Sequence, residues 1–194
     1  MSGPSDSIRA FIAVELNQAI KDIVQSAIKS LQESEVDVKW VNAQNAHLTL
    51  KFLGNISVDK IPLIRQALQD ISRQTLPFVI ATEALGAFPS LDTPRVIWLG
   101  LKQGHDELKN CARKIENALN GLGFAKESRA FSGHITVGRI KSQKNLKNLA
   151  SLLKEKPFGG AETQEVKALT LFKSTLTSNG PVYDAIEAFS FAEI

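Results

Sequence analysis

The sequence predicts an α+β fold in which two pseudo-symmetric strand-helix-strand lobes, built on mixed or antiparallel sheets, flank a central cleft. Three observations indicate this class. Strand-like and helix-like segments alternate, some strand-like segments follow each other as hairpin-like pairs, and one strand-helix-strand unit occurs twice. A doubly wound parallel sheet would need regular alternation throughout the chain, so the α+β arrangement is favoured.

The first half of the chain begins with an apolar strand followed by a helix. Residues 8–16 are mostly apolar, which predicts a strand, and Asn17 is a favourable N-cap for the next helix. A short strand is predicted at 38–41. Another is predicted at 47–53, ending at Gly54 and Asn55. Ser57 is the expected cap of a second helix. The apolar residues at helical spacing in these two helices are Ile20, Ile23, Val24, Ala27, Ile28 and Leu31, then Ile61, Ile64, Leu68 and Ile71.

The second half continues with the same kinds of element. Strands are predicted at 78–88 and 95–101, and a third helix at 106–119 is expected to end at Gly121 and Gly123. The strand 134–140 precedes a lysine-rich segment that is predicted to be helical as far as Lys154. Two closing strands are expected. They span 165–176 and 183–191, separated by the turn Ser178-Asn179-Gly180-Pro181.

Length and composition fit one globular domain. The 194 residues are 43% hydrophobic and 22% charged, and residues 1–194 are interpreted as a single domain of two lobes. The net charge of +3 is compatible with RNA as a partner but does not establish it. Cys111 is the single cysteine, which excludes an intrachain disulfide and favours a cytoplasmic location. The apolar run at 8–16 contains Arg9 and Glu15, so neither a targeting signal nor a membrane span is expected.

The duplicated unit carries the functional prediction. His47 follows the apolar strand around Phe11 by 36 residues, and His134 follows the one around Ile97 by 37 residues. Because alternate side chains of a strand point to opposite faces, each histidine shares a face with the threonine two residues later. Two such strands related by a pseudo-two-fold axis would form a groove with facing imidazoles. The repeated patterns are His47-Leu48-Thr49-Leu50 and His134-Ile135-Thr136-Val137.

Paired imidazoles and hydroxyls suit displacement at phosphorus. The reaction needs a base for the attacking oxygen and an acid for the leaving oxygen, and histidine, with a pKa of about 6.5, can serve as either. His47 and His134 are therefore the predicted acid/base pair. Thr49 and Thr136 are predicted to donate hydrogen bonds to the non-bridging oxygens, where negative charge accumulates. With three histidines and one cysteine, no metal or other cofactor is predicted, although carboxylate ligands remain an alternative.

Longer stretches around the two motifs resemble a known family. The chain resembles the LigT-like RNA 2′,3′-cyclic phosphodiesterases, also called 2′-5′ RNA ligases, of the two-histidine phosphoesterase superfamily. One His-x-Thr pattern is weak evidence, but two of them 87 residues apart within such flanks are a strong signal. The matching stretches cover nearly the whole chain. They are Phe11-Ile12-Ala13-Val14-Glu15-Leu16, 45–54, Gly86-Ala87-Phe88-Pro89, Arg95-Val96-Ile97-Trp98, 131–139, Lys173-Ser174-Thr175-Leu176 and Gly180-Pro181-Val182-Tyr183.

This resemblance implies an activity and several residue roles. Members of the family hydrolyse the terminal 2′,3′-cyclic phosphate of RNA to a 2′-phosphate, so that the 3′-oxygen leaves. By the same resemblance, His47 protonates that oxygen and His134 activates water, while Phe52 and Arg139 match positions that contact the substrate. Some members also join RNA ends reversibly through a 2′-5′ bond. The implied partner is RNA with cyclic phosphate ends, tRNA fragments included. Because both motifs lie in one chain, a monomer is expected, and neither a membrane nor a cofactor is expected to be needed.

Simpler interpretations exist for individual residues. A lone histidine or strand threonine is usually structural, an arginine such as Arg139 near a strand end is often solvated or ion-paired, and Phe52 is almost as consistent with core packing. Lysines 141, 144 and 147 are interpreted as a solvated face, with contact to the RNA backbone as the alternative. The family often has proline where this chain has Gly133, and glycine leaves the backbone before the second motif freer.

Two rival functions accompany the leading hypothesis. The substrate of the same chemistry could be a small cyclic phosphate on a nucleotide or sugar, which a comparison of mononucleotide and oligonucleotide substrates would reveal. The chain could instead be an RNA-binding module without turnover, although the intact histidine and threonine pairs argue against this class.

Overall fold

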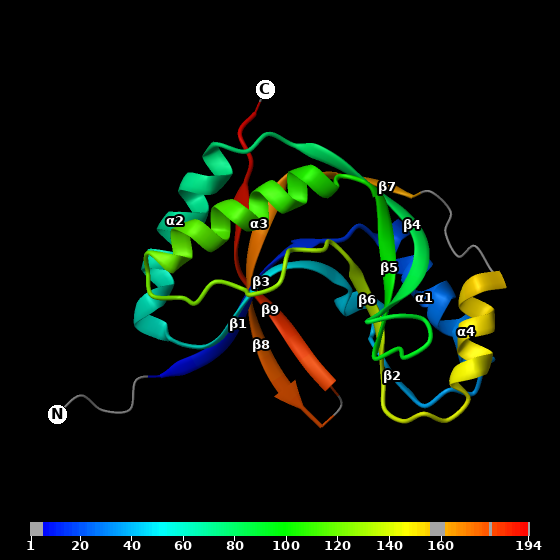
Figure 1. The fold of residues 1–194 in the computed structure, drawn as a ribbon. Helices are drawn as coiled ribbons and strands as arrows, with labels where there is room; N and C mark the ends of the chain where they lie inside the picture. Colours follow the sequence, from blue (N-terminus) through cyan, green and yellow to red (C-terminus); the bar gives the residue numbers. More distant parts are fainter. Residues whose placement is uncertain (1–5, 156–161, 179, 194) are drawn as a thin grey trace.

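The helices lie against one curled β-sheet that runs through the whole molecule (Figure 1). The computed structural model describes residues 6–155, 162–178 and 180–193. The order of strands and helices follows the predicted order closely. The elements are β1 (Ser7–Glu15), α1 (Gln18–Gln32), β2 (Val38–Trp40), η1 (Ala43–Asn45), β3 (His47–Ser57), η2 (Val58–Lys60), α2 (Ile61–Arg73), β4 (Phe78–Phe88), β5 (Val96–Gln103), α3 (His105–Asn120), β6 (Ile135–Ile140), α4 (Leu146–Glu155), β7 (Thr163–Val166), β8 (Ala168–Thr177) and β9 (Gly180–Ser190).

The strand order places the two motif strands side by side. Across the sheet the order is β7-β4-β5-β6-β3-β1-β8-β9, and β2 pairs with β6 outside this path. Each of the pairings between described strands is antiparallel. β3 and β6 meet at the centre through Leu48 and Ile135, and β1 flanks β3 as β5 flanks β6. The predicted α+β class and its pseudo-two-fold symmetry are therefore confirmed.

The two central helices are exchanged between the halves of the sheet. α1 lies between β1 and β3 in the chain, followed by β2 and η1, but packs against β6. α3 connects β5 to β6 but packs against β3. The face beneath these helices is apolar, and both Leu48 and Ile135 are fully buried there. The other face of the sheet carries a smaller cluster, Phe11, Ala13 and Phe172. Successive residues of β1 thus alternate between the main core and the open face.

Local signals define the ends of two helices as expected. The backbone N–H of Ile20 donates to Oδ1 of Asn17 at 2.9 Å, which is the predicted N-cap of α1. After α3, Gly123 has a φ of +84°, a conformation that favours glycine. No helix in the described part of the chain is both long and apolar enough to span a bilayer.

The structure corrects the predictions around residue 57. The strand predicted to end at Gly54 continues to Ser57, because Gly54, with a φ of +70°, accommodates an irregularity while β1 keeps pairing beyond it. Ser57 does not cap α2 through its side chain, since the short helix η2 intervenes. The Ser57 hydroxyl instead lies 3.3 Å from the Asp59 carboxylate.

The last third of the chain also departs from prediction. The segment predicted as one strand at 165–176 forms two, β7 and β8, because the chain changes partners at Lys167: β7 pairs with β4 and β8 with β1. The β6 strand begins one residue later than predicted, at Ile135. α4 begins at Leu146, so Lys141 and Lys144 precede the helix. Asn179 of the predicted turn lies outside the described residues.

Candidate functional site

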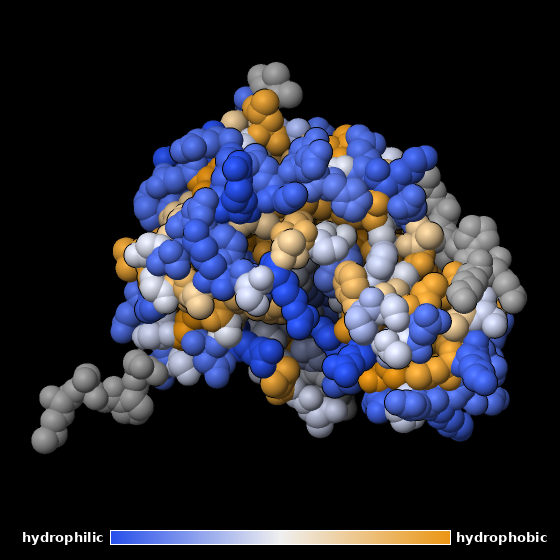
Figure 2. All heavy atoms as spheres, viewed as in Figure 1, coloured by the Kyte–Doolittle hydropathy of each residue, from blue (hydrophilic) through white to orange (hydrophobic). Residues whose placement is uncertain are grey.

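The two histidines and two threonines of the repeated motif share the open face of the sheet. His47 is the first residue of β3 and His134 immediately precedes β6. Leu48 pairs with Ile135, so extending this antiparallel register by one residue places Thr136 opposite His47 and Thr49 opposite His134. All four side chains therefore lie opposite the buried face. Figure 2 shows the surface hollowed over the region where β3 and β6 meet, with hydrophilic residues along the hollow.

Each imidazole is oriented by an equivalent hydrogen bond from its Nδ1 to the backbone carbonyl two residues earlier. Nδ1 of His47 lies 2.8 Å from the carbonyl oxygen of Asn45, and Nδ1 of His134 lies 2.8 Å from that of Ser132. A carbonyl oxygen only accepts, so each Nδ1 carries the proton and each Nε2 keeps its lone pair in the neutral ring. The Asn45 side chain also donates to the Pro181 carbonyl at 3.0 Å, which ties the segment before His47 to β9.

Aromatic rings support both imidazoles in a corresponding way. Tyr183 meets His47 edge-on, with ring centroids 5.2 Å apart and an interplanar angle of 89°. Phe88 meets His134 at 5.1 Å and 86°. The ring of Phe11 also packs against His47, with ring centroids 4.8 Å apart and an interplanar angle of 33°. Phe11, Phe88 and Tyr183 were not singled out as site residues from the sequence, although each lies in a stretch that matches the family.

Burial lowers the pKa of both histidines below the ordinary value of 6.5. For His47, the hydrogen bond to Asn45 opposes this shift and the charge of His134 adds to it. For His134, the hydrogen bond to Ser132 opposes the shift and the charge of Arg139 adds to it. Both rings are thus mainly neutral at neutral pH in the free protein. The charge of His134 thus acts on His47, and that of Arg139 acts on His134, as expected for groups that lie near one another.

Two equivalent β-bulges bring Phe52 and Arg139 to the open face. Leu50 of β3 has no pairing partner on β1, and Val137 of β6 has none on β5. Each of these unpaired residues lies three positions after the histidine of its strand. A bulge inserts one residue and inverts the later alternation. Phe52 consequently joins the histidine side, where its ring lies 6.1 Å from that of Phe11. Phe52 is 55% exposed, so the alternative of core packing is wrong.

Arg139 is exposed on the second motif strand. Its β-strand neighbours are Lys39 on β2 and Val96 on β5. Among the residues that the structure describes, no carboxylate forms an ion pair with it. Burial raises the pKa of Tyr183, and the charge of Arg139 partly counteracts that rise. The guanidinium therefore influences both Tyr183 and His134, which pack on opposite halves of the site.

The motif threonines are available to a ligand. Thr49 and Thr136 are half-buried. Within the described ranges, no protein group hydrogen-bonds either hydroxyl. Each hydroxyl can therefore donate to an anion held between the histidines.

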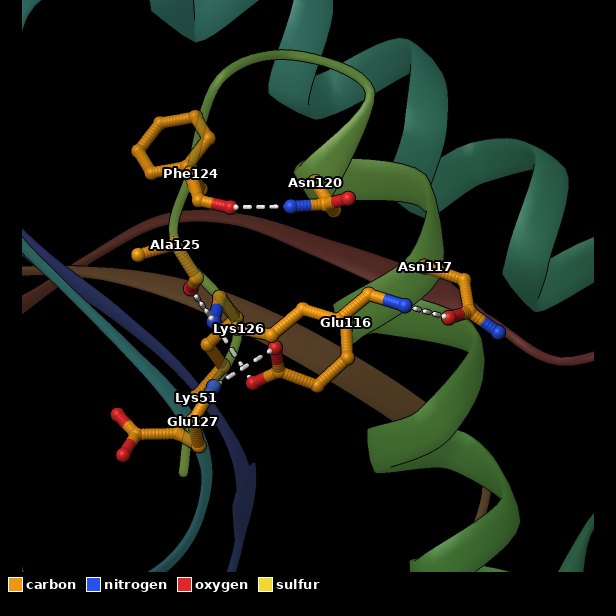
Figure 3. A network of polar contacts seen from close by, with 8 residues as sticks. All are labelled: Lys51, Glu116, Asn117, Asn120, Phe124, Ala125, Lys126 and Glu127. Atoms are coloured by element: carbon orange, nitrogen blue, oxygen red, sulfur yellow. Dashed lines mark hydrogen bonds and ion pairs between the residues drawn. The ribbon is translucent and has the colours of Figure 1, made fainter. Parts of the chain in front are cut away.

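A buried ion pair fixes β3 to the segment that leads toward His134. The ammonium of Lys51 lies 2.7 Å from Glu116 on α3 and donates to the carbonyl of Ala125 at 2.9 Å. The second carboxylate oxygen of Glu116 accepts the backbone N–H of Glu127 at 3.3 Å. Figure 3 shows these contacts closing the loop after α3 onto β3. The bulge at Leu50 makes this possible, because it turns Lys51 to the buried face.

The other candidate side chains do not join the site. Cys111 is buried in α3, and burial raises the pKa of its thiol to about 11, so it is a core residue. His105 is exposed at the start of α3 and its Nε2 lies 2.7 Å from the Leu101 carbonyl oxygen. Lysines 141, 144 and 147 are exposed. In the described part of the chain, no three His, Cys, Asp or Glu side chains come together to hold a metal.

The duplicated sheet and its paired imidazoles define a two-histidine phosphoesterase. This class is recognised by one His-x-Thr unit on each central strand. The chain belongs to the LigT like Phosphoesterase family, whose model matches residues 14–98 and again residues 99–183. The two consecutive matches coincide with the two halves of the repeat.

Relatives and solved structures agree with this assignment. The chain is 37% identical to the RNA 2′,3′-cyclic phosphodiesterase of Aquifex aeolicus over 94% of this chain and 96% of that one. It is 35% identical to the protein of the same name from Archaeoglobus fulgidus, over 94% and 99%. By structure it is similar to TT0787 of Thermus thermophilus (TM-score 0.80, 24% identity, 95% and 98% covered). It is also similar to E. coli LigT complexed with 3′-AMP (TM-score 0.78, 24% identity, 97% and 100% covered). The family resemblance predicted from the motifs is confirmed.

Proposed function

We propose that the protein hydrolyses terminal 2′,3′-cyclic phosphates of RNA to 2′-phosphates. The observation that carries this proposal is the duplicated Nδ1–carbonyl hydrogen bond, which leaves two Nε2 atoms available on one face of the sheet. The names of the relatives support the substrate class. One imidazole can deprotonate the nucleophile while the other protonates the leaving group, without a further residue.

The proposed reaction assigns one proton transfer to each histidine. Nε2 of His134 accepts a proton from water as the water oxygen bonds to phosphorus. The bond between phosphorus and the 3′-oxygen breaks, and Nε2–H of His47 gives its proton to that oxygen. The product has a 2′-phosphate and a 3′-hydroxyl, and exchange with solvent restores both rings. Thr49 and Thr136 donate hydrogen bonds to the non-bridging oxygens.

The lowered pKa values fit these roles. A neutral His134 is ready to act as a base. His47 must hold a proton in the complex, and an anionic phosphate beside it favours the protonated ring. Phe52 offers an exposed face on which the terminal base can stack, and Arg139 offers a guanidinium for the base or the phosphate.

The proposal extends to the context of the reaction. The physiological substrates are RNA fragments with cyclic ends, tRNA fragments among them, and reversible 2′-5′ ligation is a second activity of the same site. Residues 1–194 act as one domain and as a monomer, since a single chain provides both histidines. Cys111, held as a buried thiol, is compatible with a cytoplasmic location.

The test uses an oligoribonucleotide ending in a 2′,3′-cyclic phosphate, incubated with purified protein in EDTA. We expect a 2′-phosphate product, with His47→Ala and His134→Ala each reducing kcat by at least about 100-fold. His105→Ala, which alters the histidine outside the site, is the matched control and should retain full activity. Turnover that disappears with chelator and returns with a divalent metal would contradict the mechanism. A 3′-phosphate product would show that the 2′-oxygen leaves, which contradicts the proposed departure of the 3′-oxygen.

A further inference from the structure

A pocket adjoins the site on the side of His47 away from His134. It is lined by Phe11 of β1, Phe172 of β8 and Tyr183 of β9, with the residues just before His47 at its edge. Since the strand order is β6-β3-β1-β8-β9, this pocket lies beyond His47 as seen from β6. His47 itself forms part of the wall, so the pocket is continuous with the place proposed for the cyclic phosphate.

The size of the pocket limits what it can hold. Its volume is about 250 Å³. Pockets for drug-sized ligands occupy roughly 300–1,000 Å³, so this one fits a single nucleoside portion and not a longer segment. The terminal base has a different place, because Phe52 lies five residues further along β3 from His47 and does not line the pocket. The pocket therefore remains for the next part of the substrate.

The lining combines aromatic surface with one cation, Lys21, and one carboxylate, Glu15, whose Oε1 accepts a hydrogen bond from the Thr170 hydroxyl at 3.0 Å. Phe11 and Phe172 supply apolar surface, and Gln44 supplies an amide. Lys21, in the first half of α1, is the lysine that lines the pocket, and none of the described carboxylates forms an ion pair with its ammonium. Because the Glu15 carboxylate accepts a hydrogen bond from Thr170 and forms no ion pair with Lys21, the Lys21 ammonium can contact a phosphodiester while the aromatic side chains contact the attached nucleoside.

We propose that this pocket binds the penultimate nucleotide of an RNA strand, with Lys21 contacting the phosphodiester that joins it to the terminal nucleotide. This inference rests on the proposed function. Because His47 protonates the 3′-oxygen, the terminal ribose lies beside His47, and the strand must continue from that ribose toward its 5′ side. The pocket next to His47 is where a continuing strand meets both a cation and apolar surface. The preferred substrate is then an oligonucleotide and not a small cyclic phosphate.

The test compares adenosine 2′,3′-cyclic phosphate with the dinucleotide ApA bearing the same cyclic end. We expect wild-type kcat/KM to be at least about tenfold higher for the dinucleotide, the size of effect expected from one charge-assisted contact. Lys21→Met should reduce that ratio to about two or less. Lys29→Met, which removes an exposed lysine two turns further along the same helix, should leave both values unchanged.

Each result has a distinct meaning. Equal wild-type values for the two substrates would overturn the inference while leaving the proposed function intact. A loss of the same factor on both substrates in Lys21→Met would also overturn it, because the lysine would then act on the terminal nucleotide or on the fold. Absence of turnover on both substrates would refute the proposed function, and the inference would fall with it.

Discussion

Removing Glu116 should destabilise the protein more than removing Lys51, although the two side chains form one ion pair. The Lys51 side chain is 1% exposed and that of Glu116 is 18% exposed. In Glu116→Leu the buried ammonium keeps only the Ala125 carbonyl, and an uncompensated buried charge costs about 3–5 kcal/mol. In Lys51→Met the carboxylate is nearer to water and keeps the Glu127 N–H, so the expected cost is about 1–3 kcal/mol.

Equilibrium urea unfolding measures these differences through the transition midpoint at constant m-value. The double variant Lys51→Met/Glu116→Leu removes both charges and should lower the free energy of unfolding by less than Glu116→Leu alone does. Lys126→Met is the control. The ammonium of this exposed lysine donates a hydrogen bond to Asn117, as Figure 3 shows, and its loss should change the free energy of unfolding by less than about 0.5 kcal/mol. A Glu116→Leu cost no larger than that of Lys51→Met, or strictly additive single costs, would refute this reasoning.

Three further predictions concern the site. The pH profile of kcat/KM should be bell-shaped with its maximum below pH 6.5, because burial lowers the pKa of both motif histidines and the maximum lies at their mean; a maximum at or above pH 7 would contradict this. Phe52→Ala should reduce kcat/KM on RNA about tenfold through lost base stacking. Leu63→Ala, which truncates a side chain of similar exposure (56% against 55%) on α2, should not, as steady-state assays of both would show. Gly86→Val should lower the Tm and activity together, because a Cβ at Gly86 would lie only 2.4 Å from the Trp98 ring; a variant with normal thermal unfolding and kinetics would count against this close packing.

The features that the sequence predicts well are local ones. Strand alternation depends on neighbouring residues, so the shared face of His47 and Thr49 follows from their spacing. Asn17 caps α1 because capping needs only residues within one turn. The fold class follows from the repeat, since two equal units in one chain favour a pseudo-two-fold arrangement.

The features that escaped prediction depend on partners distant in the chain. Simple alternation would turn Lys51 to the open face and Phe52 to the core, and the structure has the reverse because pairing with β1 skips Leu50. The break between β7 and β8 at Lys167 likewise follows from a change of partner strand. The contact of Tyr183 with His47 joins residues far apart in the sequence, and no local pattern encodes it.

The exchanged helices bear on how such a chain could have arisen. If the chain were cut between the matched halves 14–98 and 99–183, each piece would keep its motif strand but lose the helix that covers it. A single-unit ancestor could bury that strand only by pairing with a second copy, each copy lending its helix to the other, as in a domain-swapped homodimer. Gene fusion would then have joined two copies that already depended on each other. The two lobes of the present chain differ at the equivalent positions after the bulges, which carry Phe52 in one lobe and Arg139 in the other.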